Sequence, residues 1–317
     1  MRLVFCGSGT FAVPTLKALM AAEHELAMIV TQPPRKAGRG GKLRPTPISA
    51  AAEQAGRGEI VYECPSINKP EALEKLQAAE YDVMVVVDFG QLIKQPARQT
   101  AKRSAFNLHG SILPELRGAA PVNWALIRGY ERTGVTTFEL VDKMDAGPVY
   151  ESDELTIGPE ETAAELRERL SKLGVDTVLR TLGELDAGWA SAVEQDHEKA
   201  TLAPRLKKAD GRIDWSADAE EIHNLIRGTW PWPGGQTLFV RENGKELPLV
   251  IARASVADGH ARSEPGTVDG DLCVSTGEGR LQIEQLKPAG KRLMDWKDFT
   301  NGYRVQCGNR FLAVTDE

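Results

Sequence analysis

Five consecutive apolar residues, Val83 to Val87, constrain the fold of this chain more than any other feature. An apolar run without polar alternation is typical of a parallel strand that helices cover on both faces. The residues before it repeat a rhythm of short apolar runs and helical patterns. We expect strands at 3–6, 25–31 and 59–62, and helices at 11–22, 47–55 and 70–79. This βαβ rhythm predicts an α/β domain with a doubly wound, mostly parallel sheet.

The second half of the chain predicts a different architecture. Apolar residues recur at helical spacing from Glu161 to Leu185, and Gly188 is a suitable end for that helix. Residues 189–209 are polar and weakly patterned, as in an extended linker. Short strands separated by glycine-rich turns then indicate a small barrel. Because 317 residues exceed the usual size of one core, we expect two domains, 1–188 and 210–317, joined by the linker 189–209.

Composition and charge limit the possible partners and locations. Hydrophobic residues make up 41% and charged residues 26% of the chain, which is typical of a globular protein. The formal net charge is -6, so a nucleic acid could be attracted only through local basic patches. The N-terminus lacks the pattern of a signal peptide, and no apolar run approaches the ~20 residues of a membrane span. We therefore expect a cytoplasmic protein.

Neither the cysteines nor the histidines have the spacing of a metal site. The four cysteines lie far apart without a Cys-x-x-Cys pair, so we expect reduced, buried thiols and no zinc site or disulfide framework. His24, His197, His223 and His260 show no ligand spacing and are expected at the surface or in the linker. The sequence predicts no metal.

A glycine-rich turn follows the first apolar run. The segment from Gly7 to Ala12 fits the pattern G-x-G-x-x-A between a strand and a helix, which is the fingerprint of dinucleotide binding. That fold normally places an acidic residue at the end of the second strand to hold the ribose, but here the strand ends in Val30-Thr31-Gln32. We therefore favour a plain tight turn, with a nicotinamide oxidoreductase as an alternative.

A basic segment follows the second predicted strand. It contains five cations and no acidic residue, and its glycines make it flexible: Arg35, Lys36, Arg39, Lys42 and Arg44. Such a loop could bind phosphates, or it could simply be solvated surface. A P-loop is excluded because the glycine spacing before Lys42 is wrong and Leu43 replaces the hydroxyl residue of that motif.

The strongest candidate for chemistry is the pair Asn107 and His109. At a strand end, this i, i+2 spacing points an amide and an imidazole to the same side. Asp145 adds a carboxylate beside the turn residue Gly147 and could approach from a separate loop. Taken singly, each residue could equally well be structural. Together, the three groups could transfer an acyl group to an amine without a covalent intermediate.

Longer motifs contain these residues. They are Asn107-x-His109-x-Ser111-x-Leu113-Pro114, Arg117-Gly118-Ala119-Ala120-Pro121 and Met144-Asp145-x-Gly147. With them the chain resembles the formyltetrahydrofolate-dependent formyltransferase family. Other segments resemble the methionyl-tRNA branch of that family: Arg212-Ile213-Asp214-Trp215, Trp230-Pro231-Trp232-Pro233 and Lys287-Pro288-Ala289-Gly290-Lys291.

The resemblance implies a Rossmann-like catalytic domain followed by an OB-like barrel. It implies transfer of a formyl group from the co-substrate 10-formyltetrahydrofolate to the amino group of a methionylated initiator tRNA, by a monomer. The catalytic set would be Asn107, His109 and Asp145. The folate-binding residues would be Ser111, Ile112, Leu113 and Pro114, with Asp88, Phe89 and Gly90. The tRNA-binding residues would be Arg35, Lys36, Arg39, Lys42 and Arg44 at the acceptor stem, and Lys207, Lys287, Lys291 and Arg304 in the barrel.

Two segments depart from the pattern of the family. The family usually has Gly-Thr-Pro where this chain has Gly7-Ser8-Gly9, and Ala-Tyr-Gly where it has Asp88-Phe89-Gly90. The second segment lines the folate pocket in the family, so the departure concerns how the pterin is bound.

Three other readings compete with this one. A sugar-nucleotide formyltransferase would share the catalytic domain, but the Arg-Ile-Asp-Trp segment and the barrel favour tRNA. A folate hydrolase or dehydrogenase module would need further domains that the chain lacks. An RNA-binding protein with an inactive transferase domain is disfavoured because Asn107, His109 and Asp145 are all present.

Overall fold

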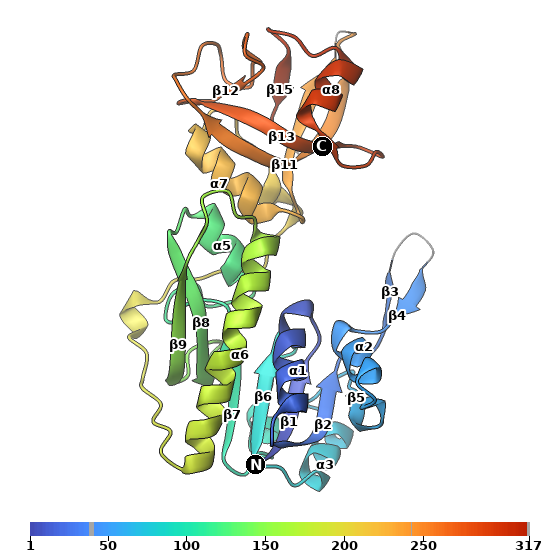
Figure 1. Cartoon of the computed structure of the whole chain (residues 1–317), viewed down its shortest axis with the longest axis vertical. Helices are drawn as coiled ribbons and strands as arrows, with labels where there is room; N and C mark the ends of the chain where they lie inside the picture. The colour runs from blue at the N-terminus through green and yellow to red at the C-terminus, as the bar shows by residue number, and fades with distance from the viewer. Residues whose placement is uncertain (38–40, 242, 316–317) are drawn as a thin grey trace. The chain divides into compact units, whose positions relative to one another are not determined.

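A computed structural model describes residues 1–37, 41–241 and 243–315 (Figure 1). The chain forms two compact units in space. The first consists of Met1–Gly118, Thr133–Leu155 and Arg167–Ala203, and the second of Ala119–Arg132, Thr156–Leu166 and the residues from Pro204 onward. Each unit combines several separate ranges of the sequence, so it does not test where a domain ends along the chain. The predicted boundaries of the linker, 189 and 209, therefore stay predictions.

The larger sheet is parallel over most of its width. Its seven strands lie in the order β5-β2-β1-β6-β7-β8-β9. The first five are parallel to one another, and β8 runs antiparallel to β7. Their bounds are β1 (Arg2–Gly7), β2 (Glu25–Thr31), β5 (Val61–Glu63), β6 (Val83–Val87), β7 (Ser104–His109), β8 (Arg132–Glu139) and β9 (Val149–Thr156). The predicted doubly wound sheet is confirmed, and β8 and β9 extend it with strands that the sequence pattern did not indicate.

Helices and 3-10 turns connect these strands or follow the last of them. They are η1 (Thr10–Ala12), α1 (Val13–Ala21), α2 (Pro47–Gln54), η2 (Gly58–Ile60), α3 (Pro70–Ala78), α4 (Gln95–Arg98), α6 (Ala163–Ala187) and η3 (His197–Lys199). All five side chains of β6 are buried, as its apolar run predicts. Helix α6 packs tightly on β7, because a Cβ at Gly174 would lie 2.4 Å from a methyl group of Leu108.

The second unit contains a curved antiparallel sheet in the order β12-β13-β11-β10-β15, with β14 paired to β13. This arrangement confirms the predicted OB-like barrel domain as an open, half-closed form. The elements that lie wholly in the second unit are α5 (Pro121–Ile127), η4 (Lys208–Gly211), α7 (Ala219–Thr229), β10 (Gly235–Val240), β11 (Glu246–Ala257), β12 (Val274–Ser275), β13 (Arg280–Pro288), β14 (Met294–Asp295), α8 (Trp296–Tyr303) and β15 (Arg310–Leu312).

Aromatic rings fill the core of this curved sheet. The ring centroid of Phe239 lies 5.3 Å from those of Phe299 and Phe311, and Trp215 lies 5.5 Å from Phe311. The Trp215 indole donates a hydrogen bond to the Thr237 hydroxyl at 3.0 Å. Ile213 and Trp215 of the Arg-Ile-Asp-Trp segment therefore belong to the core, which explains these two residue types without any contact to a substrate.

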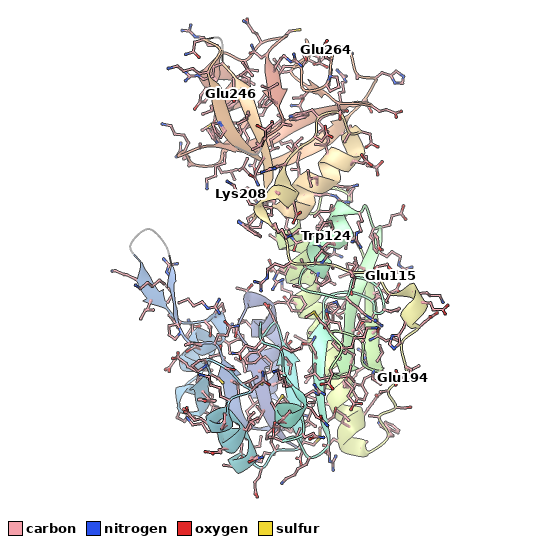
Figure 2. The ribbon with its side chains drawn as sticks, turned by 180° about the vertical axis from the view of Figure 1, so that it is seen from behind. Glu115, Trp124, Glu194, Lys208, Glu246 and Glu264 are labelled. Atoms are coloured by element: carbon pink, nitrogen blue, oxygen red, sulfur yellow. The ribbon has the colours of Figure 1, made fainter. Side chains whose placement is uncertain are left out.

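Helix α5 packs on α7 within the second unit. The Asn123 amide donates to the carbonyl of Gly228 at 2.8 Å, and a Cβ at Gly228 would lie 2.6 Å from Ile127. The Trp124 indole donates to the carbonyl of Pro204 at 2.7 Å, just before η4 and Lys208 (Figure 2). The end of the segment expected to be an extended linker is thus fixed against a helix.

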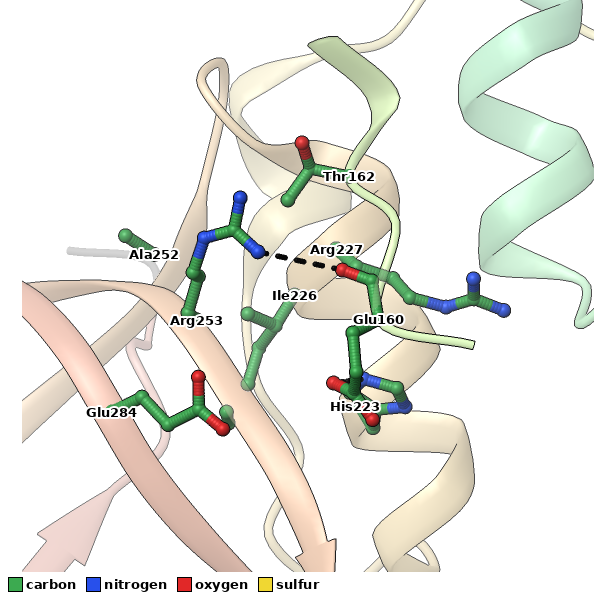
Figure 3. A pocket seen from close by; sticks show the side chains of 9 residues that line it. Glu160, Thr162, His223, Ile226, Arg227, Ala252, Arg253 and Glu284 are labelled. Carbon is green, nitrogen blue, oxygen red and sulfur yellow. Dashed lines mark hydrogen bonds and ion pairs between the residues drawn. The ribbon is translucent and has the colours of Figure 1, made fainter. Parts of the chain in front are cut away.

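Two predictions about cysteine and histidine side chains were wrong. Cys6, Cys64 and Cys273 are buried free thiols, but Cys307 is exposed. His223 is buried on α7, not at the surface, and its Nε2 lies 3.1 Å from a carboxylate oxygen of Glu160. The two residues line a polar cavity with Arg227, Arg253 and Glu284 (Figure 3), and Arg253 is paired with Glu165.

Stability in acid should depend on His223. Burial lowers its pKa below the ordinary value of 6.5, although the carboxylates of Glu160 and Glu284 oppose this and the Arg227 cation adds to it. Below about pH 6.5 the unfolded chain then binds a proton that the folded chain resists. We expect the free energy of unfolding to fall as the pH drops from 6.5 through the lowered folded-state pKa. Thermal melts of wild type and His223→Gln between pH 8 and 5 test this, because the variant should lose part of the slope. Parallel slopes would contradict it.

Candidate active site

Asn107 and His109 stand on β7, in the interior of the parallel sheet. Asn107 pairs with Val86 on β6 and with Phe138 on β8. Its spacing from His109 places the two side chains on the same face of the strand. Within the described part of the chain, the Asn107 side chain makes no hydrogen bond, so its amide is available to a ligand.

His109 is buried and held from two sides. Its Nε2 lies 2.9 Å from the carbonyl oxygen of Leu116, and its ring stands edge-on to Phe138 with centroids 6.3 Å apart. Because a carbonyl can only accept, this nitrogen carries the proton. The other ring nitrogen, Nδ1, lies 3.9 Å from an oxygen of Asp145. The structure thus brings the predicted histidine and carboxylate face to face, at slightly more than hydrogen-bond distance.

Asp145 is fixed by its own backbone and by a neighbouring loop. Its φ angle of 51° lies in the left-handed region, which Asp tolerates better than most residues. Its carboxylate accepts a hydrogen bond from the backbone N–H of Gly118 at 2.7 Å. Two residues later, a Cβ at Gly147 would lie 1.8 Å from the carbonyl oxygen of Glu139 on β8. Glycine is therefore required there for the Asp145 loop to approach the sheet.

A second layer of residues supports Asp145, and sequence reasoning missed it. The amide of Gln195 donates to the carbonyls of Asp145 at 3.1 Å and Gly147 at 2.7 Å. The buried guanidinium of Arg117 donates to Gln195 Oε1 at 2.6 Å and lies 2.9 Å from His197. Gln195 belongs to the polar segment predicted as a linker, and no local pattern distinguishes it from its neighbours.

The same segment pairs with the Arg-Gly part of the motif. The backbone of Arg117 donates to Thr201 at 2.9 Å and accepts from Ala203 at 2.7 Å. A Cβ at Gly118, whose φ is 126°, would lie 2.5 Å from the carbonyl oxygen of Ala203. The absence of a side chain at Gly118 thus allows the segment around Ala203 to pack against the residue that binds Asp145. Part of the predicted linker is therefore packed against the first unit.

The loop proposed to contact folate is compact. The Ser111 hydroxyl donates to the carbonyl of Glu115 at 2.6 Å, and the Leu113 N–H donates to Thr136 Oγ1 at 3.2 Å. Ile112 packs on Gly134 of β8, and Pro114 is half-buried. The Ser111 side chain is therefore committed to the loop, so a contact of this segment with folate would use its backbone and apolar surfaces.

The segment after β6 lies beside the glycine turn after β1. The Phe89 ring is buried in the core of the sheet, so a ligand could reach only its backbone. Asp88 is half-buried, and its carbonyl accepts hydrogen bonds from the N–H groups of Ser8 and Gly9 at 3.1 Å each. In a dinucleotide site the N–H groups of this turn face the pyrophosphate. Their use by Asp88, with no acidic residue at the end of β2, argues against the nicotinamide alternative.

In the basic segment, where the sequence suggested a flexible loop, β3 (Arg35–Ala37) and β4 (Lys42–Arg44) pair as two antiparallel strands, called here the hairpin β3–β4. Arg35 stands opposite Arg44, and the described cations of the hairpin are exposed. Arg39 lies outside the described residues. Like charges directly opposite one another destabilise a strand pair. A surface of this kind suits contact with a polyanion.

The other proposed tRNA-binding residues belong to the second unit. Lys207 precedes η4, Lys287 lies on β13, Lys291 follows that strand, and Arg304 ends α8 in a left-handed conformation. All four side chains are exposed. Because the four residues lie on different elements, the structure shows that each is an exposed cation but does not show that they form one patch.

No described helix is long and apolar enough to cross a membrane. In the same residues, no group of three or more histidine, cysteine or acidic side chains is arranged to hold a metal ion.

Comparisons with known proteins agree with this architecture. Residues 1–182 match the family model of formyl transferase, and residues 205–304 match that of the formyl transferase C-terminal domain. A methionyl-tRNA formyltransferase of Solibacter usitatus is 41% identical, over 96% of this chain and 96% of the relative. One from Roseobacter denitrificans is 40% identical, over 98% of this chain and 99% of the relative.

Solved structures show the same fold at lower identity. HypX from Aquifex aeolicus in complex with tetrahydrofolic acid has a TM-score of 0.64 and 16% identity, covering 96% of this chain and 47% of that longer protein. An N-formyltransferase from Helicobacter canadensis, in complex with folinic acid and dTDP-3-aminofucose, has a TM-score of 0.65 and 16% identity, covering 90% and 100%. The close relatives are decisive, since they align along nearly their whole length: the chain belongs to the formyl transferase family and, within it, to the methionyl-tRNA formyltransferases.

Proposed function

We propose that this chain transfers the formyl group of 10-formyltetrahydrofolate to the amino group of methionyl initiator tRNA, which prepares the tRNA for translation initiation. The observation that carries the proposal is the convergence of Asn107, His109 and Asp145 on one side of β7 in a chain of this family. Each group has a task in acyl transfer to an amine, and none of the three needs a metal or a covalent intermediate.

The reaction begins when the neutral amino nitrogen attacks the formyl carbon. A carbon–nitrogen bond forms, and the carbonyl electrons move onto the formyl oxygen to give a tetrahedral oxyanion. The Asn107 amide donates a hydrogen bond to this oxyanion, and the positive charge of a protonated His109 stabilises it electrostatically. One preorganised donor such as the Asn107 amide typically contributes about 3 to 4 kcal/mol. The bond to N10 of the folate then breaks, the carbonyl re-forms, and N10 takes up a proton as tetrahydrofolate leaves.

Asp145 balances the charge and the proton transfers. An imidazolium at His109 would donate to Leu116 through Nε2 and face the Asp145 carboxylate through Nδ1, so both N–H groups have an acceptor. The carboxylate also takes up or relays the proton that leaves the attacking amine. Catalytic hydrogen bonds are often long before substrate binds, so the distance of 3.9 Å is compatible with this role.

The direct test follows the fate of a labelled formyl group. With radiolabelled 10-formyltetrahydrofolate and methionyl initiator tRNA, we expect label in the formylmethionyl ester and one tetrahydrofolate released for each formyl group transferred. Release of labelled formate at the same rate with and without tRNA would contradict transfer and favour a hydrolase.

The hairpin β3–β4 should serve tRNA and not folate. Lys42→Ala together with Arg44→Ala should raise the KM for tRNA and leave the KM for folate unchanged, because phosphate contacts position a substrate without taking part in the chemistry. The dependence of log KM on log salt should fall by roughly 0.7 to 0.9 for each phosphate group that the variant no longer binds. Lys172→Ala, which removes an exposed lysine paired with Glu168 on α6, is the matched control. An equal rise in the KM for tRNA and in the KM for folate would contradict the assignment of this hairpin to tRNA binding.

The remaining expectations concern the assembly and location of the chain. We expect a monomer in the cytoplasm, and sedimentation of the purified protein would show a single species of 34.6 kDa. A stable dimer would contradict the first expectation.

A further inference from the structure

The strand order of the large sheet reverses between β1 and β6. From β1 the chain proceeds to β2 and β5 on one side, and it returns to β6 and β7 on the other. The carboxyl ends of parallel strands at such a switch point form the crevice in which ligands of open α/β sheets bind. The turn Gly7-Ser8-Gly9 and the segment Asp88-Phe89-Gly90 lie at the carboxyl ends of β1 and β6, at this switch point, and they are also the two places where the sequence departs from the family.

The structure shows that the two departures are in contact. A Cβ at Gly9 would lie 1.8 Å from Oδ2 of Asp88 and 2.5 Å from its Cγ. The carboxylate therefore occupies the space that any side chain at position 9 would need. Asp88 itself has a φ of 46°, a left-handed conformation that Asp and Asn adopt more readily than other non-glycine residues. The glycine at position 9, after β1, is thus complementary in shape to the aspartate at position 88, after β6.

Arg167 of α6 holds this carboxylate in place. Its Nη2 lies 2.6 Å from Oδ2 of Asp88, and its guanidinium carbon lies 5.2 Å from the centre of the Phe11 ring on η1. Both side chains of the pair are partly exposed, at 41% for Arg167 and 31% for Asp88, and such pairs contribute little to stability. The consequence of the pair is therefore geometric, because it ties three elements together at the crevice.

Backbone and amide hydrogen bonds extend the arrangement to β2. The N–H groups of Ser8 and Gly9 donate to the carbonyl of Asp88, and the Ser8 hydroxyl accepts from the N–H of Gln32 at 3.1 Å. The Gln32 amide in turn donates to the carbonyl of Phe89 at 2.8 Å. The ends of β1, β2 and β6 thus form one network, and Asp88 is the member that also connects it to α6.

We propose that Asp88, anchored by Arg167, is a positioning residue for the folate co-substrate. The inference rests on the proposed function and deepens it. Asp88 sets the conformation of the Phe89-Gly90 backbone at the carboxyl end of β6. It acts on folate binding without contacting the reacting atoms. The contacts of Asp88 are with Arg167 and with the turn after β1, so we expect the effect to fall on the affinity for folate and not on kcat.

The first experiment measures folate affinity directly. The probe is 5-formyltetrahydrofolate, whose formyl group is not on the reacting N10, and its Kd is measured by fluorescence titration without tRNA. Asp88→Asn keeps the left-handed backbone but removes the charge, and Arg167→Gln removes the partner. We expect each to raise the Kd, and the KM for 10-formyltetrahydrofolate, about tenfold, because the Phe89-Gly90 backbone is no longer held in one conformation for the ligand. The kcat and the KM for tRNA should stay unchanged.

A second ion pair supplies a matched control. Arg180 on α6 pairs with both Asp153 and Glu151 on β9, and the exposed fractions of 44%, 28% and 27% resemble those of the Arg167 pair. Arg180→Gln therefore removes two ion pairs of the same kind from the same helix, away from the end of β6. It should leave the Kd for folate unchanged. An equal rise in Kd for Arg180→Gln and Arg167→Gln would mean that any loss of an α6 pair loosens the unit, and the proposal would be wrong.

A double-variant cycle tests the contact itself. Gly9→Ala should raise the Kd because its methyl group meets the Asp88 carboxylate. In Gly9→Ala combined with Asp88→Gly that carboxylate is absent, so the double variant should bind folate as well as Asp88→Gly alone. Additive losses would overturn the inference. If wild type binds no folate, the proposed function itself fails, whereas normal binding by wild type and by every Asp88 and Arg167 variant removes only this inference.

Discussion

Asp145→Asn should lower kcat by about 10² to 10⁴, the range typical of a group that handles a proton in the transition state. Asparagine tolerates the left-handed backbone at this position and can still accept the hydrogen bond from Gly118. The substitution therefore removes the negative charge opposite His109 with little change in shape. The KM for both substrates should stay close to that of wild type, because no part of the proposed binding surface changes.

The control for this prediction lies in the same loop. Asp142 is 80% exposed and pairs with Arg98 at the surface. Asp142→Asn removes the same charge at nearly the same place in the chain, and it should retain full turnover. Comparable rates for Asp142→Asn and Asp145→Asn would show that Asp145 has no special role.

Asn107→Ala should lower kcat by about 10² to 10³, as expected when one preorganised donor to an oxyanion is removed. Since the Asn107 amide has no hydrogen-bond partner among the described residues, its removal should change the free energy of unfolding by no more than about 1 kcal/mol. Steady-state kinetics and a thermal melt of the same preparation measure both quantities. A large loss of stability together with the loss of rate would mean that Asn107 is structural, and normal turnover would exclude it from the site.

The parallel sheet could be predicted because its signal is local. The side chains of β6 are buried on both faces, so its sequence is continuously apolar, and β2 was predicted with the bounds that it has in the structure. The bounds of β5 were less accurate, because residues 58–60 form a 3-10 turn and the strand begins at Val61. In a strand with mixed burial, such as β9, charged residues interrupt the apolar ones, so the sequence pattern did not indicate that strand.

The candidate site could be predicted only in its first layer. Asn107 and His109 share a strand, so their spacing alone places them on the same side. The support from Gln195 and Thr201 comes from pairings between segments 78 and 85 residues apart, which no local pattern encodes. His223 was misplaced for a similar reason, because its burial depends on the surroundings of Glu160, far away in the sequence. The contact between Gly9 and Asp88 likewise requires the crossover between β1 and β6.

The acceptor is the central claim, and a competition experiment tests it most directly. Labelled 10-formyltetrahydrofolate is offered to the protein together with methionyl initiator tRNA, uncharged tRNA and an amino-sugar nucleotide in one reaction, and the labelled products are separated. We predict label in the methionyl ester of the charged tRNA alone, because in the proposed function the basic hairpin and the barrel cations bind tRNA and the reaction needs a free amine. Label in the sugar, or none in the charged tRNA, would contradict this account.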